Sequence, residues 1–345
     1  TGYGFDGWFT SAQGGSAVNA DTVMSTAGNH TLYAHWSANA YTVNFDANGG
    51  TCPDSSKSVA YDSAYGTLPI PTRTGYGFDG WFTSAQGGSA VDADTVMSTA
   101  SNHTLYAHWS ANAYTVNFNA NGGTCPDSSK SVTYNSAYGT LPIPTRTGYG
   151  FDGWFTSAQG GSVVDADTVM STASNHTLYA HWSANTYTVN FNANGGTCPT
   201  ASKEVNFNSA YGTLPIPTRT GYGFDGWFTS AQGGSAVNAD TVMSTAGNHT
   251  LYAHWSANAY TVNFNANGGT CPTASKEVNF NSAYGTLPIP TRTGYGFDGW
   301  FTSAQGGSAV NADTVMSTAS NHTLYAHWIA NTHTVSFDAN GGTCS

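Results

Sequence analysis

A strict internal repeat constrains the fold of this 345-residue chain more than any other feature. The octapeptide NHTLYAHW occurs five times, always at an interval of 73 residues, over 29–36, 102–109, 175–182, 248–255 and 321–328. A fixed long period is typical of an array of units rather than of one large domain. A unit of about 70 residues can close its own small core, although small domains bury a lower fraction of their surface than large ones. The sequence therefore predicts several small domains in tandem.

The tryptophans follow the same period and help to define the units. All ten belong to two series: Trp8, Trp81, Trp154, Trp227 and Trp300, and Trp36, Trp109, Trp182, Trp255 and Trp328. We expect a partial repeat over 1–36, complete repeats over 39–109, 112–182, 185–255 and 258–328, and the start of a further repeat over 332–345. Because both ends of the sequence fall inside the repeat pattern, we expect it to be a segment of a longer polypeptide.

Composition favours a folded chain and narrows the classes of partner. Hydrophobic residues make up 39% and aromatic residues 14%, so disorder is not expected. Only 8% of residues are charged, and the net charge of −11 repels the phosphate backbone of nucleic acids. The longest apolar runs span only a few residues, which is too short to cross a bilayer. We therefore expect neither nucleic-acid binding nor membrane insertion within this segment.

The first half of the repeat over 39–109 has a strand pattern. Tyr41, Val43 and Phe45 alternate with polar residues, which is the period of a half-buried strand. Asn48-Gly49-Gly50 then provides residues that tolerate a positive φ in a turn. A second alternation through Val59 and Tyr61 predicts a second strand.

The second half of the repeat is less regular. Pro69 and Pro71 remove backbone donors, so 67–75 should be an irregular crossover or a short helical turn. The aromatic segment over 76–82 predicts a strand with a bulge near Asp79-Gly80. The segment over 89–102 is ambiguous between helix and strand, whereas 103–109 predicts a strand with alternate residues on its two faces.

Three motifs of the repeat, in this order, resemble a known family. They are YTVNFDANGG, YGTLPIPTRTGYGFDGWFTSAQGG and NHTLYAHW. The chain resembles the Listeria–Bacteroides repeat, also called the internalin B-repeat type, over nearly its whole length. The resemblance implies an α+β, mostly β, fold with one small β-grasp (ubiquitin-like) unit per repeat. It also implies a place in large surface or secreted proteins, and it provides no catalytic residues. The cysteine of GGTC departs from the usual family pattern, in which small or polar residues are commoner.

The connections between the expected units are short. SANA over 37–40 and 110–113, and SANT over 183–186, leave about four residues between neighbours. Adjacent domains then have little room for independent rotation. We expect an elongated, semi-rigid rod in which each repeat adds roughly 30–40 Å.

Each repeat has one cysteine, and the five are candidates for disulfides between chains. They are Cys52, Cys125, Cys198, Cys271 and Cys344. No repeat can close a bridge internally, and equivalent positions in a linear array should lie beyond the Cα separation of about 7 Å that a disulfide needs. One alternative is a free, partly buried thiol that packs as a small hydrophobic group. Metal binding is the other, although no second ligand lies at suitable spacing.

One N-glycosylation triplet, Asn-His-Thr, also recurs in each repeat. Its candidate acceptors are Asn29, Asn102, Asn175, Asn248 and Asn321, in the turn before the last strand. In a bacterium the triplet would be incidental, whereas in a eukaryotic host it would carry a ladder of glycans.

The remaining side chains do not form a recognisable catalytic or metal site. The loop DANGG suggests a calcium ligand at Asp46, but three of the five copies have asparagine there, and the closing bidentate glutamate is missing. His30 and His35 are five residues apart, which places them on opposite faces of a strand. No nucleophile elbow and no paired carboxylates are found. We expect no enzyme activity, no cofactor and no bound metal.

Two functions remain open at this point. The first is a non-catalytic extracellular stalk, spacer or fibre of a cell-surface or secreted adhesin-type protein, with other copies of itself or other surface proteins as partners, side by side or end to end. The second is a multivalent module that binds glycans or host proteins, in which tyrosines and tryptophans stack on the ligand. Tryptophan burial distinguishes them, because a buried indole cannot serve as a binding platform.

Overall fold

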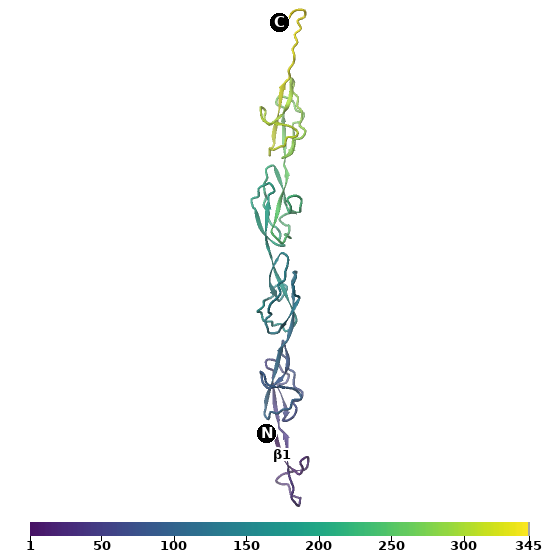
Figure 1. The fold of residues 1–345 in the computed structure, drawn as a ribbon, viewed down its shortest axis with the longest axis vertical. Helices are drawn as coiled ribbons and strands as arrows, with labels where there is room; N and C mark the ends of the chain where they lie inside the picture. The colour runs from purple at the N-terminus through teal and green to yellow at the C-terminus, as the bar shows by residue number, and fades with distance from the viewer. Residues whose placement is uncertain (344–345) are drawn as a thin grey trace. The chain divides into compact units, whose positions relative to one another are not determined.

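Each complete repeat folds into its own five-stranded sheet. The computed structural model describes residues 1–343. In Figure 1 each sheet occupies one narrow part of the colour scale, so it is built from one contiguous segment of the chain. The chain divides into two compact units, one formed by 1–146 with 151–183 and the other by 147–150 with the residues from 184 onward.

The strands recur in the same order in every repeat. The partial repeat contains β1 (Tyr3–Phe9), β2 (Ala17–Val18) and β3 (Tyr33–Ala38). The first complete repeat contains β4 (Ala40–Asp46), β5 (Ser56–Ala60), β6 (Tyr76–Phe82), β7 (Ala90–Val91) and β8 (His103–Ala111). The second contains β9 (Ala113–Asn119), β10 (Ser129–Thr133), β11 (Tyr149–Phe155), β12 (Val163–Val164) and β13 (His176–Ala184). The third contains β14 (Thr186–Asn192), β15 (Ser202–Asn206), β16 (Tyr222–Phe228), β17 (Ala236–Val237) and β18 (His249–Ala257). The fourth contains β19 (Ala259–Asn265), β20 (Ser275–Asn279), β21 (Tyr295–Phe301), β22 (Ala309–Val310) and β23 (His322–Ala330).

The first and last strands of a repeat pair in parallel at the centre of its sheet. In the first complete repeat the order is β5-β4-β8-β6-β7. β4 and β8 are parallel, with Val43 opposite His103 and Phe45 opposite Leu105, and the other pairs are antiparallel. The alternation predicted for 41–45 is confirmed, since Val43 and Phe45 are buried and their neighbours are not.

The predicted bulge is confirmed, and it explains the parity of the aromatic residues in β6. The register between β6 and β8 shifts between Phe78 and Gly80. As a result Phe78 and Trp81, an odd number of residues apart, both pack against the same core. Phe82 instead stacks on the imidazole of His108, with ring centroids 3.9 Å apart.

Residues 1–343 contain no helix, so the α component of the expected α+β class is wrong. The segment over 89–102 forms the short strand β7 and then an irregular stretch that bonds to the chain before the crossover. Met97 N–H donates to the carbonyl of Ser63, and Tyr65 N–H donates to the carbonyl of Thr95. Within this segment Thr95 N–H and the Thr95 hydroxyl both donate to Asp92 Oδ1, a local capping pattern that competes with a helical ladder. The two prolines keep the crossover irregular. No helix capable of crossing a membrane occurs in the described part of the chain.

Every complete repeat has a separate hydrophobic core of the same composition. In the first, the buried residues include Val43, Trp81, Met97 and Leu105, and Trp81 is only 2% exposed. Its indole N–H donates to the carbonyl of Pro69 at 2.9 Å, which satisfies the one polar atom of this side chain. Equivalent clusters form in the other three complete repeats.

The partial repeat lacks counterparts of β4 and β5 within 1–36, and its aromatic residues are correspondingly exposed. Its sheet has the order β2-β1-β3. Trp8, the equivalent of Trp81, is 48% exposed, and it packs edge to face on Phe5. Indole burial therefore depends on the strands and crossover that precede it in a complete repeat.

Candidate functional site

The strands run through the segments that the sequence predicts as linkers. In the first unit, β8 ends at Ala111 and β9 begins at Ala113, so only Asn112 separates them. In the second unit, Asn258 alone separates β18 from β19. Each of these asparagines is also held to the preceding repeat, because Asn112 N–H donates to the carbonyl of Gly75 and Asn258 N–H donates to that of Gly221, both at 2.9 Å. The connection is therefore shorter than the four residues expected, and it is hydrogen-bonded.

An aromatic contact closes the same junction. In the second unit, the ring of Tyr222 meets the ring of Phe280 edge to face, with centroids 5.6 Å apart. Gly221, with φ of 81°, lies so close that a Cβ there would come within 2.3 Å of the Phe280 ring. In the first unit, Gly75, Tyr76 and Tyr134 repeat this arrangement. A glycine is required because it allows both the positive φ and the close approach of the next repeat.

An arginine lies on the open side of this contact. The guanidinium carbon of Arg219 is 4.0 Å from the ring centroid of Tyr222. Arg219 also donates through Nη1 to the carbonyl of Asn194 at 3.4 Å. In the first unit, Arg73 takes the same position on Tyr76, again at 4.0 Å. A stacked guanidinium of this kind keeps its charge and most of its donors available.

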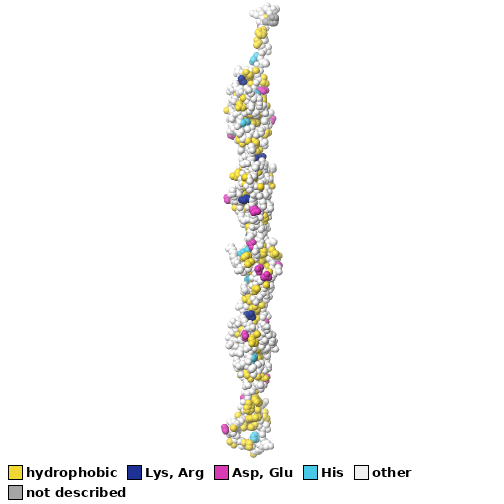
Figure 2. Space-filling view, turned by 90° about the vertical axis from the view of Figure 1, so that its left-hand side faces the viewer, with side chains coloured by type: hydrophobic (Ala, Val, Ile, Leu, Met, Phe, Trp, Pro, Cys, Tyr) yellow, Lys and Arg dark blue, Asp and Glu magenta, His cyan; other side chains and the backbone are white. Residues whose placement is uncertain are grey.

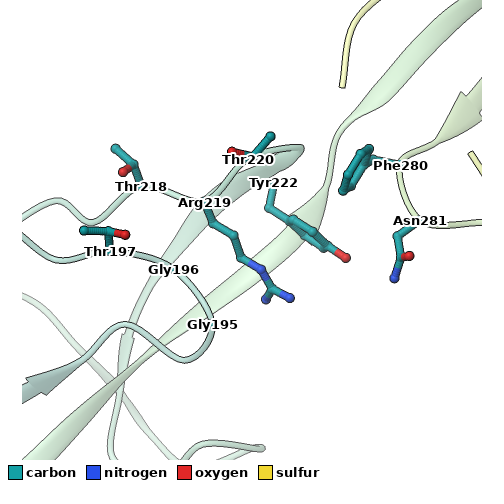
Figure 3. A pocket seen from close by; sticks show the side chains of 9 residues that line it. All are labelled: Gly195, Gly196, Thr197, Thr218, Arg219, Thr220, Tyr222, Phe280 and Asn281. Carbon is teal, nitrogen blue, oxygen red and sulfur yellow. The ribbon is translucent and has the colours of Figure 1, made fainter. Parts of the chain in front are cut away.

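These side chains line an open cleft at the junction, which is the candidate site. Figure 3 shows the Arg219 side chain beside the Tyr222 ring, between the Gly195-Gly196 turn and Asn281. The cleft has a volume of about 640 Å³. It is lined by Gly195, Gly196, Thr197, Thr218, Arg219, Thr220, Tyr222, Phe280 and Asn281. Another cleft of about 640 Å³ in the first unit is lined by Gly49, Gly50, Thr51, Thr72, Arg73, Thr74, Tyr76, Tyr134 and Asn135.

Sequence analysis missed this site, although a signal was present. In a chain with only 8% charged residues, PTRTGY places one arginine and one tyrosine in each complete repeat, at the interval of 73. The charge-poor surface is visible in Figure 2, where isolated charged side chains stand out from a mostly uncharged face. The aromatic wall could not be assigned from one repeat alone, because Phe280 belongs to the repeat after Tyr222.

The described cysteines do not reach this cleft. Cys52, Cys125, Cys198 and Cys271 are free and half-buried, and each packs against the core of its own repeat. Burial raises the pKa of the Cys125 thiol, which reduces its thiolate fraction. Cys344 lies outside the described residues. The disulfide between chains remains a hypothesis.

The candidate glycan acceptors have a structural role in the complete repeats. Asn102 Oδ1 accepts a hydrogen bond of 2.8 Å from Thr42 N–H, which ties the start of β8 to β4. Asn175, Asn248 and Asn321 accept the equivalent bond. The Asn102 side chain is exposed, as is that of Asn29 in the partial repeat. Modification at Nδ2 would leave the Oδ1 acceptor in place, so glycosylation remains untested.

Other predicted positions have ordinary structural contacts. Asp46 Oδ1 accepts from Asn48 N–H at 2.8 Å, and Asn119 Oδ1 accepts the equivalent bond at the same distance, so either residue closes the turn. His103, the equivalent of His30, shares a hydrogen bond of 2.7 Å with the hydroxyl of Tyr65. His35 stacks on Phe9.

Tryptophan burial weakens the idea of stacking platforms in the complete repeats. Trp81, Trp154, Trp227 and Trp300 are each only 2% exposed. The second series packs against the core, and Trp109 donates through its indole N–H to the carbonyl of Ala47. Among the tryptophans, only Trp8 and Trp36 of the partial repeat are largely exposed.

Comparison with known proteins agrees with the repeat pattern. A protein of Evansella cellulosilytica whose name describes a Gly-rich membrane protein is 35% identical over 99% of this chain, and a membrane protein of the same bacterium is 33% identical over 87%. The matched regions span 40% and 45% of those two proteins. Internalin H of Listeria monocytogenes is 35% identical over 42% of this chain and 26% of its own length.

The family model supports the same assignment along most of the chain. The model of the Listeria-Bacteroides repeat domain matches residues 1–35, 41–108, 114–181, 187–254 and 260–327. These five matches are tandem and cover most of each repeat, and Asn112 and Asn258 of the junctions lie between consecutive matches. The chain therefore belongs to the Listeria-Bacteroides repeat family.

Proposed function

We propose that this array is a non-catalytic extracellular stalk or spacer of a cell-surface or secreted adhesin-type protein. The observation that carries the proposal is the junction, in which one hydrogen-bonded asparagine and one aromatic contact leave little slack between neighbouring repeats of a unit. Near-identical copies suit this role, because a spacer requires length rather than a distinct site in each unit. The names of the relatives, membrane proteins and an internalin, support a location at the cell surface.

The finer fold assignment belongs to the same proposal. The strand order with a central parallel pair, β5-β4-β8-β6-β7, corresponds to the order 2-1-5-3-4 within one repeat. We propose that this is a β-grasp sheet in which an irregular crossover stands where a helix would otherwise pack. The buried Met97 and the backbone bonds between 62–66 and 93–97 support this interpretation.

Small-angle X-ray scattering of the full chain tests the stalk. One compact globule of this length would have a radius of gyration of roughly 20 Å. Freely jointed repeats would give roughly 30 Å, whereas a straight array with roughly 30–40 Å per repeat would give roughly 40–55 Å. We expect the last of these values. A radius near that of the single globule would contradict the proposal.

Assembly with further copies, side by side or end to end, is the other part of this hypothesis. The charge-poor surface supports it, because few like charges oppose close approach. Sedimentation of the full chain over a range of concentrations would reveal such association as a concentration-dependent increase in mass.

A further inference from the structure

Among residues 1–343, Arg219 has no acidic partner. Its contacts within the described residues are the carbonyl of Asn194 and the ring of Tyr222. Arg73 and Arg292 have the same two kinds of contact, and neither contacts a carboxylate in the described part of the chain. This is unexpected in a chain with 19 acidic and 8 basic side chains, in which acidic partners are abundant. An unpaired guanidinium of fixed orientation is a ready partner for an anion.

The remaining lining of the cleft consists of neutral polar groups. Thr197, Thr218, Thr220 and Asn281 are exposed, and their side chains have no hydrogen-bond partner within residues 1–343. In Figure 3 Asn281 lies on the side toward which the Arg219 guanidinium extends, whereas Thr218 and Thr220 line the cleft from the segment that carries the arginine. Three hydroxyls and an amide provide donors and acceptors in addition to the fork of Arg219. Such a lining suits a hydroxylated ligand better than an apolar one.

Local charge also favours an anion at this cleft over the one in the first unit. The repeats over 185–255 and 258–328 each contain three acidic and two basic residues, whereas 39–109 contains six acidic and two basic. The wall residue equivalent to Asn281 is an aspartate only at Asp62, where it accepts from the Tyr3 hydroxyl. At the clefts of Arg219 and Arg73 this position is an amide, Asn281 and Asn135, so the difference between the two lies in the acidic residues of the surrounding repeats, which are fewest around Arg219.

We propose that the junction clefts bind the carboxylate or sulfate groups of an acidic polysaccharide. The guanidinium of Arg219 would take the anionic group, and the threonines and Asn281 would take neighbouring hydroxyls. The same lining recurs around Arg73, and a cleft of about 590 Å³ around Arg292 has the same arginine, threonine and glycine wall. A polymer with regularly spaced anionic groups can occupy several clefts at once, so weak single contacts add to a measurable avidity. The inference does not depend on the stalk role.

The test is binding of the full chain to four immobilised polymers at physiological salt. Polygalacturonate presents carboxylates, heparin presents sulfates, dextran presents neither, and poly-L-glutamate presents carboxylates without sugar. We expect binding to polygalacturonate or heparin and none to dextran. Polygalacturonate alone would assign the ligand to carboxylates, and heparin alone would assign it to sulfates.

Two matched variants connect the binding to the clefts. Replacing the four equivalent arginines by glutamine, Arg73→Gln, Arg146→Gln, Arg219→Gln and Arg292→Gln, should lower apparent affinity at least tenfold. A control variant removes the same charge by replacing the four repeat lysines, Lys57→Gln, Lys130→Gln, Lys203→Gln and Lys276→Gln. Its apparent affinity should change less than threefold. A third variant with lysine at the four arginine positions keeps the charge but lacks the fork, and should fall between them. Thermal unfolding of each variant reports whether its repeats remain folded, and single Arg219→Gln serves if the fourfold variant does not fold.

Three results would overturn the proposal. One is equal loss of binding in the arginine and lysine variants, since net charge alone would then explain it. Another is failure of the wild-type chain to bind either acidic polysaccharide. The third is binding to poly-L-glutamate as tight as that to polygalacturonate, which would assign the clefts to protein carboxylates instead of glycans.

Discussion

A single indole in each complete repeat connects the sheet, the crossover and the core. Trp81 contacts Phe45 of β4 and Phe78 of β6, and it donates to the carbonyl of Pro69 in the crossover. Trp8, the equivalent residue of the partial repeat, contacts Phe5, which corresponds to Phe78. It has no counterpart of Phe45 or Pro69 within residues 1–36. The same residue type therefore has two different energetic roles in one chain.

Truncating these two tryptophans should have different effects. Trp81→Ala creates a buried cavity and removes a hydrogen bond, so it should destabilise its own repeat by about 3–5 kcal/mol. Trp8→Ala, the matched control, removes a half-exposed side chain and should cost less than about 1 kcal/mol. Denaturant titration followed by fluorescence should show one early transition in the first variant, with the other repeats unchanged. Similar curves for the two variants would contradict this account of the core.

Alkaline pH should weaken every complete repeat. Burial raises the pKa of Tyr65 above its ordinary value, and the same holds for Tyr138, Tyr211 and Tyr284. Because the folded pKa is the higher one, this contribution to stability is complete below about pH 10 and is lost as pH rises through the folded pKa. Ionisation also removes the proton that Tyr65 shares with His103.

The free energy of unfolding measured between pH 8 and pH 11 checks this expectation. Wild-type stability should fall above about pH 10. A variant with phenylalanine at all four positions should have a flatter profile, although it starts lower because His103 and its equivalents lose their partners. Parallel profiles would assign the alkaline loss to other groups.

At the scale of the strands, local features were predictable and distant pairings were not. The alternation over 41–45 and the bulge at Asp79-Gly80 follow from side-chain parity, and the structure confirms both. The parallel pairing of Val43 with His103 joins residues sixty positions apart, and no local pattern specifies it. The expected helical component is absent from residues 1–343, where the backbone over 93–97 bonds to residues 62–66 before the crossover instead of forming a helical ladder.

For the junction, the sequence predicted only that the connection between repeats is short. The interval between motifs required a short connection, but the continuous strands, the stacked arginine and the aromatic wall depend on the next repeat. Arg219 and Phe280 are far apart in the sequence and meet the same tyrosine. Within one copy the sequence marks only the arginine and tyrosine of PTRTGY, and the aromatic wall of the site comes from the next copy.

Two glycines with the same backbone conformation should differ in their effect on the junction. Gly221 and Gly294 both have φ of 81°, so alanine at either position should cost about 1–2 kcal/mol in backbone strain. Only Gly221→Ala places a Cβ against the Phe280 ring, because nothing lies within 4 Å at Gly294. The first variant should therefore loosen the junction, and the second should not.

Scattering of the two full-length glycine variants provides the measurement. Gly221→Ala should lower the radius of gyration and broaden the distance distribution, while Gly294→Ala should reproduce the wild-type curve. Identical curves for the two variants would show that the aromatic contact does not restrain neighbouring repeats.

At the scale of the whole molecule, the thiols decide whether chains are joined covalently. The four described cysteines are half-buried in separate cores, and burial raises the pKa of Cys125. We therefore expect slow reaction with a thiol reagent in the folded chain and rapid reaction in denaturant.

Non-reducing electrophoresis of a Cys344→Ser variant isolates those four thiols from the one outside the described residues. It should show a monomer. A ladder that collapses on reduction would instead establish disulfides between chains through the core-packed cysteines.

The parallel pairing of the first and last strands determines how a complete repeat carries tension. The chain enters the sheet at the start of β4 and leaves it at the far end of β8, and these two strands lie side by side and parallel. A force transmitted along the backbone therefore slides one strand past the other and loads their shared hydrogen bonds together, instead of peeling them apart one by one. In the proposed stalk, the shear strength of these central strand pairs would set the tension at which a repeat unfolds.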